Sequence, residues 1–293
     1  MSDIIAAPSV RALARQKGID IEKLARDLGR TSIAREDLGG SDTATPAQNN
    51  HATYWDVDHA QYGPVTEEPM SRFAQVASAN LAAANTMIPQ VTHHDRANVS
   101  AIEALRIQMK PEAQARGIKL TALAFHVKAL ARALHEFPRL NASLTLDGKT
   151  LILKNFVHIG IAVDTANGLI VPVIRNADRK GLWQIATEIT DLATRAQARK
   201  IKPDEMGGAS MSISNLGGIG GLAFTPIVNP PEVAILGLTR TEMTPVWDGE
   251  AFQPVPMVPM DLSYDHRVIN GADAARFVAY LAGLLTDPRR MMI

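Results

Sequence analysis

The apolar pattern of the chain changes twice, and these changes limit the folds that it can adopt. Residues 1–38 carry two short helical stripes, the first stopped by Gly18 and the second by Gly29. Residues 39–66 show no apolar periodicity, as is typical of a flexible linker. From residue 67 helical and strand patterns alternate. The pattern predicts a small all-α domain over 1–38, a flexible linker over 39–66, and a large α+β domain over 67–293.

The helices and strands of the large domain are predicted from the spacing of its apolar residues, which follows a helical pattern in some segments and a strand pattern in others. Amphipathic helices are expected near residues 70–81, 120–134, 182–200 and 272–285. Strands are expected near residues 156–163, 169–173, 210–214, 233–239 and 257–264, with a hairpin turn at 165–168. This order indicates an α+β fold with a mixed sheet and flanking helices.

The composition excludes several classes of protein. Lys and Arg together number 30, as do Asp and Glu, so the formal net charge is zero. This balance argues against a nucleic-acid-binding surface, which needs clustered positive charge. The absence of Cys excludes disulfides, thiolate nucleophiles and Cys-based zinc sites. The sequence has no secretory signal and no 18-residue apolar run, and we expect a soluble, cytoplasmic protein without a membrane span.

Two further patterns resemble binding motifs but lack the context that those motifs require. His93, His94 and Asp95 are adjacent, and adjacent residues rarely point at one ion from a regular element. Residues 218–223 match G-x-G-x-x-A, yet Pro226 follows too soon for the helix that would bind a pyrophosphate. We therefore expect neither a metal site nor a dinucleotide site.

The most informative local feature is a histidine flanked by charged residues in the segment 262–271. His266 lies between an expected strand end and an expected helix start, where a turn can hold it rigidly. Imidazole titrates near neutral pH, so His266 could take and return a proton during catalysis. The same pattern is compatible with a surface loop in which Asp265 and Arg267 are simply solvated. The local pattern alone leaves both interpretations open.

A second candidate lies in the strand expected at residues 210–214. Alternation along a strand places Ser212 and Ser214 on one face. Hydroxyl groups on that face could donate hydrogen bonds to a developing oxyanion. The alternative is a polar strand face that runs into a Gly-rich turn, and the local pattern by itself favours this alternative.

At these two segments the chain resembles the dihydrolipoyl acyltransferase subunits of 2-oxo acid dehydrogenase complexes. Residues 265–271, Asp-His-Arg-Val-Ile-Asn-Gly, match the D-H-R-x-x-x-G signature of those subunits. Further similar segments extend the resemblance over residues 67–293, and they comprise 88–92, 158–164, 168–176, 224–229 and 231–237. The chain is most similar to the acetyl-transferring branch, which belongs to pyruvate dehydrogenase complexes.

The resemblance implies an enzyme that moves an acyl group, in this branch acetyl, between dihydrolipoyl-lysine and coenzyme A without a metal. It implies that His266 is the general base, which takes the proton from the attacking thiol. It also implies that Ser214 donates a hydrogen bond to the tetrahedral oxyanion and that Asn270 supports the site. The other members of the signature are expected to be structural: Asp265, Arg267 and Gly271.

The resemblance also implies a fold and an assembly. The family fold is similar to that of chloramphenicol acetyltransferase, a trimer with a mixed sheet. In such a trimer the active site lies between subunits, with His266 of one chain facing Ser214 of its neighbour. The family's trimers assemble into cubic or icosahedral shells, and we expect a homotrimer that builds a larger shell.

The N-terminal segment resembles the peripheral subunit-binding domain of the same family, which holds decarboxylase or dihydrolipoyl dehydrogenase subunits. The resemblance rests on residues 7–15 and 18–20. Arg11 and Arg15 lie four positions apart on one expected helix face, a suitable patch for an acidic partner. A solvated helix face is the alternative. Residues 26–33 depart from the Gly-rich loop usual in the family, so the partner stays open.

A lipoyl domain, which family members normally carry, is not expected within this sequence. None of its lysines lies in the Asp-Lys-Ala context that receives the lipoyl group. The chain is therefore expected to be a fragment or to receive the lipoyl arm in trans from another polypeptide. Two other functions stay open: a scaffold that organises partners through residues 1–38, and a stand-alone acetyltransferase with a small-molecule acceptor. The motif at His266 argues against the first, and the subunit-binding segment argues against the second.

Overall fold

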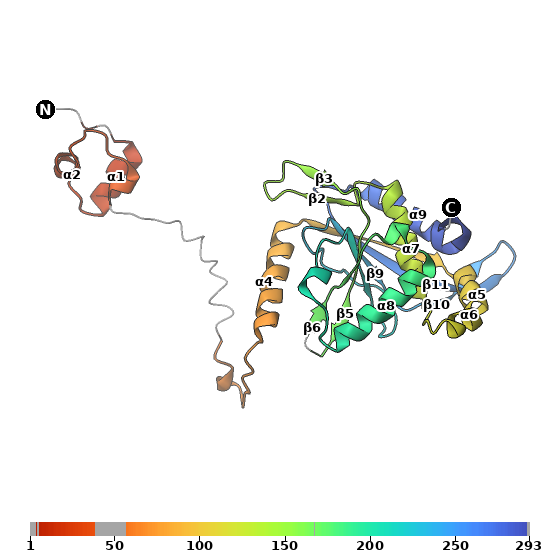
Figure 1. The fold of residues 1–293 in the computed structure, drawn as a ribbon. Helices are drawn as coiled ribbons and strands as arrows, with labels where there is room; N and C mark the ends of the chain where they lie inside the picture. Colours follow the sequence, from red (N-terminus) through yellow and green to blue (C-terminus); the bar gives the residue numbers. More distant parts are fainter. Residues whose placement is uncertain (1–3, 5, 39–56, 167, 292–293) are drawn as a thin grey trace. The chain divides into compact units, whose positions relative to one another are not determined.

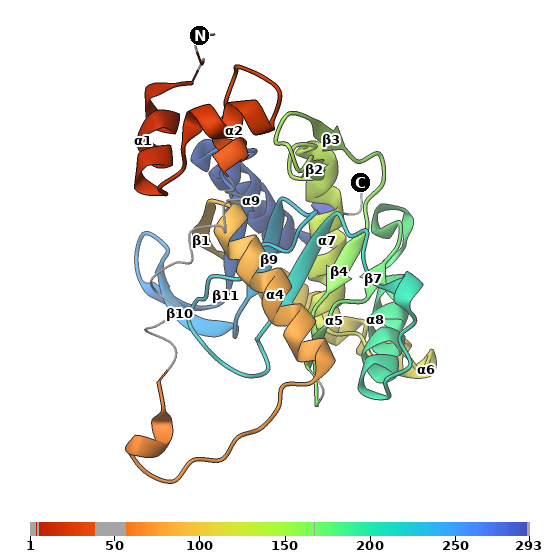
Figure 2. The same cartoon turned by 90° about the vertical axis from the view of Figure 1, so that its left-hand side faces the viewer.

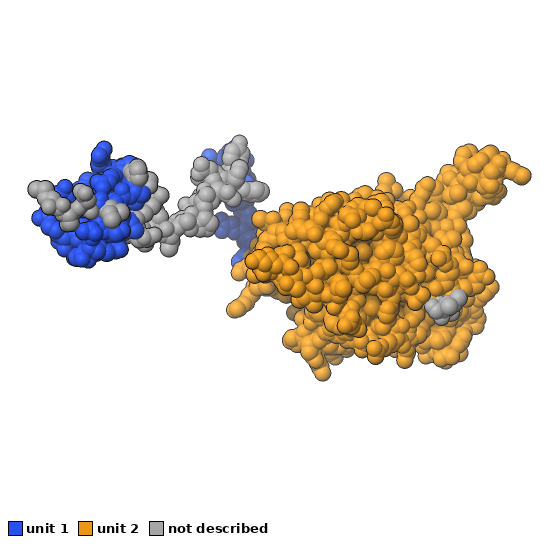
Figure 3. Space-filling model, turned by 90° about the horizontal axis from the view of Figure 1, so that it is seen from above, with its two compact units in different colours: residues 1–69 blue, residues 70–293 orange. Residues whose placement is uncertain are grey.

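The computed structural model describes residues 4, 6–38, 57–166 and 168–291. The chain divides into two compact units, Met1–Pro69 and Met70–Ile293, which are coloured separately in Figure 3. Most of the linker expected over residues 39–66 lies outside the described residues.

The N-terminal unit is built around two short helices. Helix α1 (Pro8–Gln16) and helix α2 (Ile21–Asp27) form where the apolar stripes predict them. Asp20 caps α2, because its carboxylate accepts the backbone N–H groups of Glu22 and Lys23. Two 3-10 turns follow, η1 (Arg35–Leu38) and η2 (His59–Gln61). Five buried side chains form a miniature core: Val10, Ala14, Ala25, Ile33 and Leu38.

A seven-stranded mixed sheet forms the centre of the second unit (Figure 1). Six strands follow one another in the order β1 (Gln90–Asn98), β11 (Phe252–Asp265), β9 (Ala234–Leu238), β8 (Met211–Asn215), β4 (Ile159–Ile161) and β7 (Val173–Ile174). The seventh strand, β10 (Glu242–Trp247), pairs with the first part of β11. Strands β4, β8 and β9 run parallel, whereas the other pairs are antiparallel. The expected α+β fold with a mixed sheet is confirmed.

Two small hairpins accompany the sheet. Strand β2 (Ala142–Leu144) pairs with β3 (Leu151–Leu153), and β5 (Val163–Thr165) pairs with β6 (Gly168–Ile170). The second hairpin pairs Thr165 with Gly168, at the two ends of the turn that the sequence predicts.

Helices cover both faces of the sheet, but unequally (Figures 1 and 2). One face carries four helices, namely α5 (Ser100–Gln108), α7 (Ala122–Glu136), α8 (Leu182–Gln197) and α9 (Gly271–Thr286). The short helix α6 (Lys110–Ala115) continues from α5. The opposite face carries α4 (Arg72–Met87). Three 3-10 turns complete the unit: η3 (Ala177–Arg179), η4 (Pro203–Glu205) and η5 (Pro288–Met291).

The hydrophobic core lies between the sheet and the four-helix face. Helices α7 and α9 direct their apolar stripes into this core, as their periodicity predicts. Phe125 and Leu134 of α7 and Phe277 and Leu281 of α9 are almost fully buried there. Alternate residues of the central strands reach the same core, among them Met211, Ile213, Met260 and Leu262.

The other face of the sheet carries polar side chains, because successive residues of a strand point to opposite faces. We call it the polar face. It is defined by residues that alternate with core residues along β8 and β11, and by the residues of β1 that pair with these: Ser212, Ser214, Asp261, Ser263, Thr92 and His94. Ser214 therefore lies on the face of the sheet opposite to the helical core, into which its neighbour Ile213 packs.

Candidate active site

His266 lies in a tight turn between β11 and α9. Its backbone N–H donates to the carbonyl oxygen of Pro89 (3.1 Å). The backbone N–H of Asp265 donates to the carbonyl oxygen of Val233 (2.9 Å), so two other segments hold the turn. The imidazole is exposed, with its ring centre 5.8 Å from that of Tyr264. The backbone is thus fixed while the imidazole is open to a ligand.

The two charged residues of the turn bind each other. Asp265 is 2% exposed, and its carboxylate accepts hydrogen bonds from the backbone N–H (3.0 Å) and from Nη2 (2.7 Å) of Arg267. Its carbonyl oxygen accepts the N–H groups of Val268 and Ile269, both at 3.0 Å. Arg139 adds a hydrogen bond from Nη2 to the carbonyl oxygen of Val268 (3.2 Å). The interpretation of this segment as a solvated loop is therefore wrong for Asp265.

Asn270 ends the turn and caps helix α9. Its side-chain oxygen accepts the backbone N–H of Asp273 (2.9 Å), which satisfies one of the free donors at the helix start. Gly271 is the first residue of the helix, and a Cβ there would lie 3.8 Å from the hydroxyl oxygen of Tyr264, an ordinary contact. Asn270 therefore determines where the helix starts relative to His266, four residues earlier.

The two serines of strand β8 have different surroundings. Ser212 is buried, and its hydroxyl donates to Oε1 of Glu232 (2.8 Å). Gly160 on the neighbouring strand β4 makes room for this hydroxyl, because a Cβ at that position would collide with it. Ser214 is half-buried near the end of β8. Ser212 therefore binds Glu232, and Ser214 is the serine of this pair that a substrate can reach.

Glu232 is a buried acid that the sequence pattern does not reveal. It is 7% exposed, and burial raises its pKa to about 7, although the hydrogen bond from Ser212 and the charge of Lys154 oppose this shift. Together with Asp265 and Arg267 it lines a cavity of about 370 Å³ beside helix α4. The turn of His266 thus borders a cavity whose wall contains an acid that titrates near neutral pH.

Ser214 and His266 each lie at the carboxyl end of a strand, but β8 and β11 run in opposite directions, so the two residues lie toward opposite ends of the sheet. Ser214 is level with Gly237 of β9, and Gly237 is level with Asp261 of β11. His266 follows Asp261 by five residues. With about 3.3 Å per residue along a strand and about 4.8 Å between strands, the two residues are roughly 15–20 Å apart. The structure does not bring them together within one chain.

A cavity of about 650 Å³ opens at the carboxyl ends of β8 and β9, between the sheet and helices α7 and α8, on the face opposite to Ser214. Asn215 lines it, together with the cationic residues Lys119 and Arg240. Thr121, the N-cap of α7, also lines the cavity. Its side chain makes no capping hydrogen bond, so it leaves the backbone N–H groups at this end of the helix uncapped. Positive side chains and a helix N-terminus favour an anionic ligand.

The two arginines of the proposed partner surface lie on helix α1. The guanidinium of Arg11 donates to the carbonyl oxygens of Ile4 (2.6 Å) and Ala6 (3.2 Å). Arg15 is exposed in the last turn of the helix. Arg11 therefore also holds the segment that precedes the helix.

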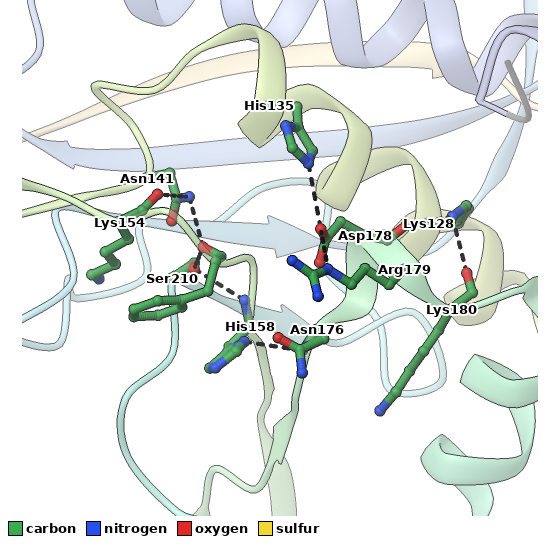
Figure 4. A network of polar contacts seen from close by, with 11 residues as sticks. Lys128, His135, Asn141, Lys154, His158, Asn176, Asp178, Arg179, Lys180 and Ser210 are labelled. Atoms are coloured by element: carbon green, nitrogen blue, oxygen red, sulfur yellow. Dashed lines mark hydrogen bonds and ion pairs between the residues drawn. The ribbon is translucent and has the colours of Figure 1, made fainter.

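A network of polar contacts at the start of β4 is structural (Figure 4). The backbone N–H of His158 donates to Oγ of Ser210 (3.0 Å), and Nδ1 of His158 accepts the backbone N–H of Asn176 (3.0 Å). Burial lowers the pKa of His158. On helix α7, Nε2 of His135 lies 3.4 Å from a carboxylate oxygen of Asp178. These histidines hold loops in place and lie apart from Ser214 and His266 in the fold.

The family of the chain follows from a comparison over most of its length. Residues 62–293 match the family model described as 2-oxoacid dehydrogenases acyltransferase (catalytic domain). The chain belongs to this acyltransferase family. The match includes Ser214, His266 and Asn270, and it confirms the resemblance drawn from residues 265–271.

Similar proteins within the acyltransferase family carry the name of one complex. The chain is 46% identical over 301 residues to the dihydrolipoyllysine-residue acetyltransferase component of the pyruvate dehydrogenase complex of Pseudomonas aeruginosa, covering 98% of this chain and 55% of that protein. It is 45% identical over 300 residues to the component of Azotobacter vinelandii, covering 98% of this chain and 47% of that protein. The chain thus spans about half the length of these relatives.

Solved structures of the acyltransferase family share the fold. The dihydrolipoamide acetyltransferase of Azotobacter vinelandii is 51% identical, with a TM-score of 0.80 over 81% of this chain and 98% of that chain. A structure of the cubic core of the pyruvate dehydrogenase multienzyme complex gives the same identity, TM-score and coverage. Both likenesses support the mixed-sheet fold described above.

Two features are missing from the described residues. Among the helices in these parts of the chain, none is long and apolar enough to cross a membrane. No group of three or more His, Asp or Glu side chains in the described ranges is placed to hold a metal ion.

Proposed function

We propose that the chain transfers an acetyl group between dihydrolipoyl-lysine and coenzyme A as the core subunit of a pyruvate dehydrogenase complex. The observation that carries this proposal is the spacing of three residues. Ser214 precedes His266 by 52 positions, and Asn270 follows His266 by four. The same intervals separate the serine, histidine and asparagine whose role in the catalytic mechanism was investigated in the Azotobacter vinelandii enzyme.

His266 supplies the proton transfer in this mechanism. Its imidazole takes the proton from the thiol of coenzyme A, and the resulting thiolate attacks the carbonyl carbon of the acetyl thioester. The carbonyl oxygen becomes an oxyanion, to which the hydroxyl of Ser214 donates a hydrogen bond. When this intermediate collapses, the other thiolate leaves and recovers the proton from His266. No covalent acyl-enzyme forms, so Ser214 is not a nucleophile.

The distance between Ser214 and His266 supports a site whose two residues come from different copies of the chain. One chain holds them roughly 15–20 Å apart, too far for a single acetyl group to touch both. In a closed cyclic oligomer each interface repeats, so every His266 meets a Ser214 of its neighbour. We propose a homotrimer, and a larger shell built from such trimers.

The cavity at the carboxyl ends of β8 and β9 suits coenzyme A. The phosphates of this substrate are anionic, and Lys119, Arg240 and the first turn of α7 offer positive charge and N–H donors. The lipoyl arm approaches from the opposite end of the site. We propose that it comes from a lipoyl domain supplied in trans, and that residues 1–38 bind a decarboxylase or dihydrolipoyl dehydrogenase subunit through Arg11 and Arg15.

The test is acetyl transfer from acetyl-coenzyme A to dihydrolipoamide by the full chain. Wild-type protein is expected to transfer acetyl, whereas His266→Ala is expected to lose about 10³-fold or more in kcat, because the general base is gone. The matched control is His135→Ala, which removes another exposed histidine, the one beside Asp178. This variant is expected to retain wild-type activity. A folded wild-type chain without transfer would contradict the proposed function.

A further inference from the structure

Four residues of the polar face form one row across neighbouring strands. His94 of β1 is level with Asp261 of β11, Asp261 is level with Gly237 of β9, and Gly237 is level with Ser214 of β8. Cross-strand partners point to the same side of a sheet. The row therefore leads from a histidine at one side of the sheet to the serine of the proposed site.

Asp261 is the buried centre of this row. It is 1% exposed, and both of its carboxylate oxygens accept hydrogen bonds. Oδ1 lies 2.6 Å from Nδ1 of His94, and Oδ2 accepts the backbone N–H of Phe224 (3.2 Å). A carboxylate can only accept, so Nδ1 of His94 carries the proton that is shared. A buried carboxylate needs such partners, because an uncompensated charge in the interior is costly.

Phe224 connects the carboxylate to the neighbourhood of Ser214. Its ring lies directly over Gly237, where a Cβ would come within 2.7 Å of two ring atoms. Only glycine leaves room for the ring at this position. Phe224 thus covers the residue that is level with Ser214, and its backbone N–H is held by Asp261.

The segment between Ser214 and Phe224 is fixed at further points. The hydroxyl of Thr239 donates to the carbonyl oxygen of Leu222 (3.1 Å), and Nη2 of Arg240 donates to the carbonyl oxygen of Ile219 (3.0 Å). The Asp261 bond to Phe224 closes the end of this segment. We call residues 216–224 the serine loop, since they follow the strand that carries Ser214.

We propose that His94 is a positioning residue for Ser214, and that it acts through Asp261 by holding Phe224 and the serine loop against the sheet. The inference rests on the proposed function. His94 lies three strands from Ser214, about 14 Å across the sheet, so it does not touch the oxyanion itself. Its effect reaches the reaction through the geometry of Ser214 and through the exclusion of water by the ring of Phe224.

The experiment combines substitutions at His94 and Ser214 in the acetyl-transfer assay. His94→Phe keeps a ring of similar size but removes the donor to Asp261, and it is expected to lower kcat about 10-fold with little change in the KM of dihydrolipoamide. His94→Asn can place an amide N–H near the position of Nδ1, and it is expected to recover activity to within about threefold of wild type. Asp261→Asn leaves one acceptor oxygen for two donors, Nδ1 of His94 and the N–H of Phe224, and is expected to match His94→Phe.

A double-mutant cycle separates positioning from a general loss of structure. In a Ser214→Ala background, His94→Phe is expected to lower kcat less than twofold further, because the group that it positions is absent. A merely structural role would lower kcat equally in both backgrounds. His135→Phe is the matched control, since it removes another half-exposed His–Asp pair on the opposite face of the sheet (Figure 4).

Each outcome bears on one claim. Wild-type kcat in His94→Phe, or an equal loss with and without Ser214, would overturn the positioning role of His94. Should His94→Phe fail to fold, the same cycle with Asp261→Asn decides the question. A folded wild-type chain without any transfer would instead overturn the proposed function, and the positioning role with it.

Discussion

The two faces of the large sheet are built from different kinds of interaction. The four-helix face is apolar, and its side chains come from helices whose periodicity marks them along the chain. The polar face is held by single hydrogen-bonded pairs, such as Ser212 with Glu232 and His94 with Asp261. The first face stabilises the fold by burial of apolar area, and the second positions the groups of the proposed chemistry. Substitutions on the two faces should therefore separate stability from activity.

The largest expected effect on the apolar face is that of Phe277→Ala. Phe277 is fully buried and packs edge-on against Phe137, with ring centres 5.5 Å apart. Removing the ring leaves a cavity, and we expect the free energy of unfolding to fall by about 3–5 kcal/mol. Denaturant unfolding followed by circular dichroism measures this loss. The activity per folded chain should stay at the wild-type value. A loss of kcat in folded protein would contradict the assignment of stability to the apolar face and of activity to the polar face.

On the polar face, Ser214→Ala is expected to affect activity and spare stability. Loss of one oxyanion donor typically lowers kcat by about 10²–10³-fold, or about 3–4 kcal/mol of transition-state stabilisation. Ser214 is only half-buried, so the free energy of unfolding should change by less than about 1 kcal/mol. Ser212→Ala is the contrasting variant, because it removes the partner of Glu232. If Ser214→Ala unfolded while Ser212→Ala lost only activity, the assignment of the two serines would be reversed.

The apolar face could be predicted from the sequence because its signals are local. Helices α7 and α9 each show their stripe within one segment, and the predicted ends lie close to the observed ones. Strand β1 could not be predicted in this way. Its residues Gln90–Asn98 are mostly polar, and it becomes a strand through pairing with β11, which lies more than 150 residues further along the chain.

The candidate site was predictable only in part, for the same reason. The turn of His266 and the strand of Ser214 are visible as local patterns, and the family resemblance added their roles. The pairs that surround them are not local, since His94 and Asp261 are 167 positions apart. The sequence suggests only a metal site for His93, His94 and Asp95, because a residue's partner across a sheet cannot be read from its neighbours in the chain. The burial of Glu232 likewise depends on the fold, which brings its carboxylate against Ser212, 20 positions earlier in the chain.

A smaller effect is expected from Glu232→Gln, and it depends on pH. Burial raises the pKa of Glu232 from 4.5 to about 7, so the folded state binds a proton more tightly than the unfolded state. The stability that this proton contributes is fully present below pH 4.5 and is lost as the pH rises to about 7, by at most about 3 kcal/mol. The uncharged amide of the variant lacks this titration. The variant should therefore gain stability relative to wild type between pH 4.5 and 7.

The quantity to measure is the difference in the free energy of unfolding between wild type and Glu232→Gln, because another buried group titrates in the opposite sense. Burial lowers the pKa of His126 from 6.5 to about 4, so its contribution is lost as the pH falls from 6.5 to 4. This contribution is common to wild type and Glu232→Gln and cancels in the difference. Denaturant unfolding at several pH values gives that difference directly. A difference that does not change with pH would show that Glu232 is ionised or neutral throughout this range.

The most direct test of the central claim is complementation between two inactive variants. Ser214→Ala and His266→Ala each leave one half of the proposed site intact. If the site combines Ser214 of one copy with His266 of another, co-expression of both variants in equal amounts restores complete sites at roughly a quarter of the interfaces. The predicted result is acetyl transfer at roughly a quarter of the wild-type rate, far above either variant alone. Activity of the mixed oligomers no higher than the average of the two variants would contradict a site shared between chains.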